Sequence, residues 1–523
     1  MSERPTTSAG ATALTTPARP AGRGNDGEQL KSGRLGVLGI VFFVVAAAAP
    51  LVGMTGAVPV AIAAGNGAGA PGAYVAVGVV LLVFASAFSA MSRVVTNTGA
   101  FFAYVGRGLG LSAGVGSAFV SVFAYLTIQL AVYGFFGGLM AGQMDATFGI
   151  DAPWWLWTLA AWALVLALSV VSVDVGAKVL GTLMVLELLS LVVVAVAVML
   201  EGGGPDGASL VDSFAPQNVF VGGLAGSAGI ALAFAFASYI RFEATAIYGE
   251  ESKDPERNVP RATYAAVGLI TVIFAAASWA VVSGLGTDDV VARVLEESSV
   301  DGVPLADPAA VLFSVAASYV GDWLATVMSW LVLSSLFAGL LAFQNCSARY
   351  FFSLGRAGVL PGALQSTNRH GAPGIGAITT SVLTGAVIVV FALAGLDPVL
   401  NLFYWSSGMA VISVVLVEVL VCLAVLVHFR GTGRGGHWWS TLAAPVLAAL
   451  GLATGLYLLI GRFGLLAGTV PEGVDPTVTA WQLSATGWTL VLLPFVLFLV
   501  GLVVGAVLSR NADQRPALRD VVG

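Results

Sequence analysis

Long apolar runs separated by short polar segments recur from Gly36 to the C-terminal region. Each run reaches about twenty residues, which is enough for one helix to cross a hydrocarbon core of roughly 30 Å. The alternating ten-residue pattern of a membrane β-barrel is absent. The pattern therefore predicts an all-α polytopic membrane protein with about 12 transmembrane helices. The expected spans are 34–64, 71–92, 113–141, 153–173, 178–200, 219–249, 262–286, 319–350, 374–395, 400–429, 438–462 and 486–509.

Two of the expected spans are interrupted near their middle. The first carries four alanines, Pro50 and then the run Gly53-Met54-Thr55-Gly56, and the sixth carries the polar run 238–243. A proline inside a helix removes one hydrogen bond and clashes with the preceding turn. Interrupted helices at matching positions of two halves indicate an inverted-repeat transporter with its site at the membrane midplane. The alternative is that Pro50 only bends a continuous helix.

Composition and charge support the membrane assignment. Hydrophobic residues make up 58% of the 523 residues and charged residues only 10%, whereas a soluble protein carries about 25% charged residues. Of the 22 basic residues, 19 fall in segments that share one side of the membrane. The three exceptions are Arg241, Arg293 and Arg462. The positive-inside rule then predicts an inner (cytoplasmic) membrane protein with both termini cytoplasmic. Residues 1–33, poor in large apolar side chains, predict a disordered tail, and residues 510–523 a second cytoplasmic tail.

Four charged residues fall well inside the expected spans, away from their ends: Glu187, Arg241, Glu243 and Glu418. Charged side chains inside a membrane are costly and normally face protein or a water-filled pathway, so these positions are functional candidates. The two cysteines and three histidines are scattered along the chain. A metal, redox or other enzymatic centre needs such ligands in a cluster, so we expect no cofactor, no metal and no enzyme activity.

Residues 242–262 read FEATAIYGEESKDPERNVPRA. This segment resembles the signature that follows the sixth helix in the amino acid–polyamine–organocation (APC) superfamily of permeases. The matching residues are Phe242, Glu243, Glu250, Glu251, Pro255, Arg257, Pro260, Arg261 and Ala262. Residues 98–110 resemble the family's loop between helices two and three, and residues 348–361 its loop after helix eight.

The resemblance implies a LeuT-type fold of five plus five inverted helices with two additional C-terminal helices. The core would occupy 34–429, with repeats at 34–200 and 219–429, and the additional helices 438–509. It also implies a secondary active transporter of amino acids that works by alternating access, as a proton-coupled symporter or an exchanger. This chain departs from the family pattern at Arg241, where a glycine is usual, and at helix five, where Glu187 stands in a stretch without the lysine of some members.

The two breaks offer complementary chemistry for a zwitterion. A half-helix starting near 53–56 would point N–H groups at a carboxylate, and unwound carbonyls at 47–49 and 237–239 would accept hydrogen bonds from an ammonium group. A polyamine would leave the N–H groups unused and ranks second. The predicted substrate-binding residues are Ala48, Ala49, Gly53, Met54, Thr55, Gly56, Gln129, Tyr133, Ala237, Ser238, Tyr239 and Arg241.

The coupling ion is expected to be H⁺ or Na⁺. Glu187 is the first candidate proton carrier and Glu418 the second, while Ser334 and Ser335 resemble the hydroxyl positions of sodium-coupled relatives. Structural alternatives remain open, since Arg241 can pair with a nearby carboxylate and Glu187 can be a protonated packing residue. The expected partners are a small-molecule substrate and the lipid bilayer, without nucleic acid. A channel and an integral-membrane enzyme are the rival classes.

Overall fold

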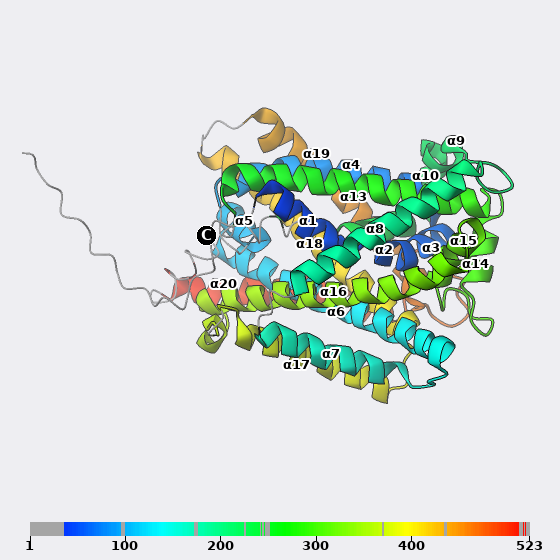
Figure 1. Ribbon diagram of the computed structural model, residues 1–523. Helices are drawn as coiled ribbons and strands as arrows, with labels where there is room; N and C mark the ends of the chain where they lie inside the picture. Colours follow the sequence, from blue (N-terminus) through cyan, green and yellow to red (C-terminus); the bar gives the residue numbers. More distant parts are fainter. Residues whose placement is uncertain are drawn as a thin grey trace, which may run out of the picture.

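Long apolar helices run alongside one another through the whole of the computed structural model (Figure 1). The structure describes residues 36–95, 100–171, 176–223, 226–240, 242, 245, 252–368, 371–432, 437–511, 516 and 518. The predicted tail 1–33, Arg241 and Glu243 therefore lie outside the described residues.

The elements of the first half are α1 (Val37–Ala48), α2 (Pro50–Gly56), α3 (Val58–Val60), η1 (Ala61–Asn66), η2 (Gly67–Gly69), α4 (Ala70–Ser92), α5 (Ala100–Leu109), α6 (Leu111–Phe148), α7 (Trp154–Val171), α8 (Gly176–Leu200), α9 (Leu210–Phe214), α10 (Pro216–Val219) and α11 (Ala228–Tyr239). Those of the second half are α13 (Pro255–Leu285), α14 (Val290–Glu297), α15 (Ala309–Tyr319), α16 (Asp322–Arg356), η5 (Gly362–Gln365), α17 (Gly374–Leu393), η6 (Pro398–Phe403), α18 (Tyr404–Thr432), η7 (Trp439–Ala443), α19 (Ala444–Ala467) and α20 (Ala485–Arg510).

The membrane-spanning character of the helices follows from their length and composition. Within the described ranges, nine helical stretches are long and apolar enough to cross a membrane. Three shorter apolar helices, Trp154–Val170, Ala228–Tyr239 and Ala309–Tyr319, accompany them. Each of the twelve predicted spans overlaps one of these helical stretches. Pro50–Ser92 covers parts of the first two spans, and Ala309–Tyr319 ends where the eighth span begins. The prediction of an all-α polytopic membrane protein is confirmed.

Several boundaries differ from the predicted ones. Residues 100–109, expected as a loop, form the helix α5. Helix α13 begins at Pro255 instead of 262, so Pro260 lies inside the helix and not in its first turn. Pro255 already occupies the first helical position, where a missing N–H costs nothing. Pro260 has no N–H to donate to the carbonyl of Glu256, four residues earlier in the helix. Glu256 is an exposed residue, so water can replace that hydrogen bond.

Arg462, expected at the end of the span 438–462, also differs from its predicted place, because α19 continues to Ala467. It lies within α19 with 7% of its surface exposed. One terminal nitrogen of its guanidinium donates to the backbone carbonyls of Pro476 and Thr477, at 3.2 and 3.1 Å. A buried charge needs such partners, so Arg462 holds the loop between α19 and α20 against the end of its own helix.

Candidate functional site

The first predicted break lies between α1 and α2, which Figure 1 places in the interior of the bundle. Ala49 has φ 45° and ψ 67°, in the left-handed region, and Pro50 begins the next helix. That region disfavours residues with a Cβ, while proline suits the first position of a helix. The interruption is therefore at Ala49, inside the range 48–56 in which the sequence predicts it. The second half-helix starts at Pro50 and not near Gly53 to Gly56, because the glycines are accommodated within the helix.

The second predicted break ends α11. The helix stops at Tyr239, and Ile240 is extended with φ −52° and ψ 132°. Arg241 and Glu243, which follow, are outside the described part of the chain. At the end of α11 the Ala237 carbonyl accepts from the Ile240 N–H at 3.2 Å, and the Tyr239 carbonyl accepts from the Phe242 N–H at 3.1 Å. A carbonyl oxygen has two lone pairs, so each of these groups can accept one further hydrogen bond.

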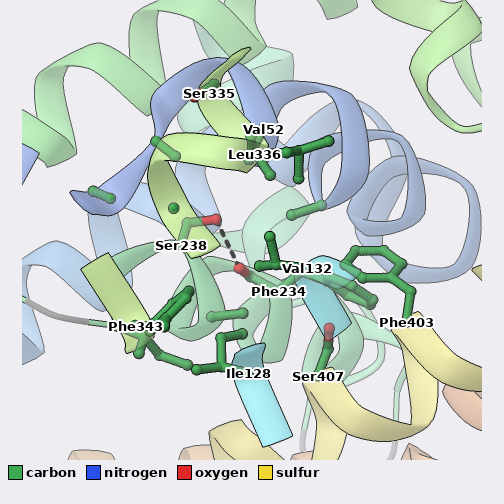
Figure 2. Close-up of a pocket in the computed structure, with 17 residues that line it drawn as sticks. Val52, Ile128, Val132, Phe234, Ser238, Ser335, Leu336, Phe343, Phe403 and Ser407 are labelled. Carbon is green, nitrogen blue, oxygen red and sulfur yellow. Dashed lines mark hydrogen bonds between the residues drawn. The ribbon is translucent and has the colours of Figure 1, made fainter. Parts of the chain in front are cut away.

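A cavity of about 660 Å³, counting the part open to solvent, lies between the two breaks. Figure 2 shows side chains from several helices pointing into it. The break segments contribute Ala48, Ala49, Val52, Gly53, Ala57, Phe234, Ala237, Ser238 and Ile240. The facing walls, from α6, α16, η6 and α18, contribute Ile128, Val132, Ser335, Leu336, Gly339, Phe343, Phe403 and Ser407.

Only part of the predicted set lines this cavity. The predicted residues that do are Ala48, Ala49, Gly53, Ala237, Ser238 and the sodium candidate Ser335. Those that do not are Met54, Thr55, Gly56, Gln129, Tyr133, Tyr239 and Ser334. Helical geometry explains the division, since consecutive residues of a helix face different directions. The Thr55 hydroxyl, for example, donates to the Leu51 carbonyl of its own helix at 2.9 Å, and the Tyr239 hydroxyl donates to the Tyr74 carbonyl at 2.8 Å.

The polar character of the cavity comes mainly from backbone. The first N–H groups of α2, before Gly53, and the last carbonyl groups of α1 have no partner within their helices, whereas the Gly53 N–H donates to the Ala49 carbonyl at 3.1 Å. The helix ends give partial positive charge near Val52, and partial negative charge near Ala48 and Ala237. No charged side chain from the described residues lines the cavity. The arrangement can therefore hold a ligand that carries one charge of each sign.

Gln129 belongs to a buried network behind the cavity wall. Its Nε2 donates to Gln344 Oε1 at 2.7 Å, and Gln344 Nε2 donates to the Ala377 carbonyl at 2.7 Å and to Ser381 Oγ at 2.9 Å. Trp162 Nε1 donates to the Ser381 carbonyl at 2.8 Å. The network joins α6, α16, α17 and α7. Gln129 thus fixes the scaffold that carries the walls, and does not face the cavity.

We expect Gln344→Leu to lower stability by about 1–3 kcal/mol, because it leaves the buried Gln129 amide without its acceptor. The measurement is the apparent Tm of the purified protein in detergent. The double variant Gln129→Leu/Gln344→Leu removes both partners and should recover part of the loss. A single variant that unfolds at the wild-type temperature would show that the network contributes nothing.

The two predicted coupling carboxyls lie close to the two breaks. Glu187 on α8 is 3% exposed, and its carboxyl faces Ser335, which lines the cavity. Ser334 instead donates to the Leu331 carbonyl of its own helix at 2.7 Å. Glu418 on α18 is 2% exposed and lines a second, smaller cavity with Ile240. Glu187 therefore lies directly behind the wall of the main cavity, and Glu418 lies against the end of α11.

The apolar wall residues were not among the predicted site residues. Ile128 and Val132 lie one position before Gln129 and Tyr133, so the sequence pointed to the right helix but to the neighbouring face. Phe343, Phe403 and their neighbours look like any other apolar residue of a membrane helix. No pattern in one sequence distinguishes an apolar side chain that faces a cavity from one that faces another helix.

Comparison with known proteins identifies a family and, among the relatives, an uncharacterized transporter. The Amino acid permease family matches residues 39–512. An uncharacterized transporter of Legionella pneumophila is 24% identical over 237 residues, which cover 45% of this chain and 48% of that protein. The chain thus spans about half the length of this curated relative. The family match covers all the described helices except the first two residues of α1.

Proposed function

The chain belongs to the amino acid permease family, whose members are membrane transporters, and we propose that it carries zwitterionic amino acids by alternating access. The observation that supports this substrate is the cavity between the breaks of α1–α2 and α11. Backbone groups of both signs converge there without a charged side chain from the described residues. A ligand with one carboxylate and one ammonium group satisfies both kinds of helix end.

In this proposal the substrate carboxylate accepts hydrogen bonds from N–H groups at the start of α2, near Val52. The ammonium group donates to carbonyls at the ends of α1 and α11, near Ala48 and Ala237. A polyamine has no group for the α2 end and would leave those N–H groups dehydrated and unpaired, which costs affinity. An amino acid is therefore the better fit.

We also propose proton coupling through Glu187. Its contact with Ser335 connects a carboxyl on α8 to the cavity wall on α16. A sodium ion between α1 and α16 would need the hydroxyl of Ser335, which this contact already involves. A carboxyl whose exposure to water changes with the state of the cavity can take up a proton on one side and release it on the other.

The proposal also includes the inverted-repeat division at 34–200 and 219–429, the cytoplasmic termini and the inner-membrane location.

Uptake into proteoliposomes tests the transport function. We expect saturable uptake of a radiolabelled amino acid and accelerated exchange when the same unlabelled amino acid is loaded inside. Putrescine at the same concentration should not compete. Flux that neither saturates nor exchanges would indicate a channel, and competition by putrescine with no amino acid uptake would indicate an amine carrier.

A further inference from the structure

The part of the cavity that faces the helix breaks is apolar. Ile128 and Val132 are four residues apart on α6 and so share one face of that helix. Leu336 and Phe343 are seven apart on α16, with Gly339 between them on the same face. Figure 2 shows the labelled side chains of Ile128, Val132, Leu336, Phe343 and Phe403 surrounding the space below the breaks.

The few hydroxyls of the lining offer little to a polar side chain. Ser238 donates to the Phe234 carbonyl at 3.0 Å (Figure 2), and Ser335 faces the Glu187 carboxyl. Among the described lining residues, Ser407 carries the third hydroxyl. A charged or strongly polar substrate side chain would lose its water against these walls without gaining matching partners. An apolar side chain would instead leave water for carbon contacts, which is favourable.

We infer that the transported amino acids are those with neutral, apolar side chains, such as leucine, methionine and phenylalanine, and that Ile128, Val132, Leu336, Phe343 and Phe403 form the side-chain pocket. This inference rests on the proposed function. The helix ends bind the carboxylate and ammonium groups common to all amino acids, and the apolar walls select among them.

The first test is competition against a radiolabelled neutral amino acid in proteoliposomes that contain the full chain. We expect leucine, methionine and phenylalanine to inhibit at concentrations at least about tenfold lower than serine, lysine or glutamate. The reason is that each methylene group missing from a hydrophobic pocket lowers the specificity of a site about tenfold or more. Strongest inhibition by lysine, serine or glutamate overturns the inference and leaves the proposed function intact. Glutamate as the best inhibitor would also direct attention to Arg241. Inhibition by putrescine alone would overturn the proposed function itself.

The second test uses variants of one helix. Phe343→Ala enlarges the pocket, so the ratio of apparent affinities for tryptophan and leucine should rise at least about tenfold. Phe337→Ala is the matched control, because Phe337 packs on the same helix without lining the cavity. It should leave the ratio unchanged. An equal change in both variants, or none in Phe343→Ala, overturns the assignment of the pocket.

A third variant keeps the test valid if Phe343→Ala does not fold. Val132→Thr keeps the shape of the side chain and adds one hydroxyl to the wall. It should lower the preference for leucine over serine. A preference identical to that of the wild type would remove Val132 from the pocket.

Discussion

Replacing Gly53 by alanine is expected to reduce transport at least about tenfold, although it adds only one methyl group. Gly53 lies in α2 at the edge of the cavity. A Cβ there would lie 2.5 Å from Cζ of Phe274 and closer still to its Cε1. The Phe274 ring is fully buried and stacks on Tyr74, with ring centroids 5.1 Å apart and planes 5° apart. The methyl group therefore forces either the ring off its stack on Tyr74 or α2 away from α13.

Such overpacking in a membrane core costs about 1–3 kcal/mol, and here the shift also displaces the start of α2. Radiolabelled uptake and substrate-induced thermal stabilisation should both fall. Gly268→Ala is the control, since a Cβ on Gly268 of α13 meets nothing within 4 Å. Gly53→Ala/Phe274→Leu makes room for the methyl group and should recover part of the activity. Wild-type uptake by Gly53→Ala would show that the close packing of α2 on α13 is not needed.

The location of the breaks could be predicted from sequence because few residues behave as proline does. Pro50 cannot continue the preceding helix and begins the next one, and the polar run 238–243 differs clearly from the apolar span around it. What the sequence could not give was the exact start of α2, because glycine fits either inside a helix or at its end. The structure places Gly53 inside α2, where the absence of a side chain permits the close approach of Phe274.

The walls of the cavity could not be predicted for a different reason. Gln129 and Tyr133 stood out as polar residues, but the partner that explains Gln129 is Gln344, 215 positions away. A pairing over that distance is a property of the folded helices and leaves no local pattern. Ile128 and Val132, which do line the cavity, are ordinary apolar residues of a span. Local periodicity therefore predicts helices and their interruptions, whereas the facing surfaces depend on how the helices pack.

Replacing Glu187 by glutamine is expected to abolish accumulation driven by a proton gradient while sparing substrate binding. The change keeps the size of the side chain and its ability to pair with Ser335, and it removes the group that can gain and lose a proton. Binding depends on the helix ends and the cavity walls, which Glu187 does not line. The affinity for substrate should therefore stay within about twofold of the wild type. Exchange of labelled for unlabelled substrate, which needs no net proton movement, should also persist.

The measurement compares uptake with and without an imposed inward proton gradient, beside binding on the same preparation. Wild-type protein should accumulate substrate only with the gradient, and Glu187→Gln should give the same low uptake in both conditions. Glu201→Gln is the matched control, because Glu201 follows α8 directly and is exposed. It should respond to the gradient as the wild type does. If Glu187→Gln still accumulates substrate with the gradient and Glu418→Gln does not, the proton site lies beside the end of α11, in the smaller cavity lined by Glu418 and Ile240. If both variants respond normally, the proton is not the coupling ion, and the same liposomes with a sodium gradient should then show accumulation that depends on Ser335.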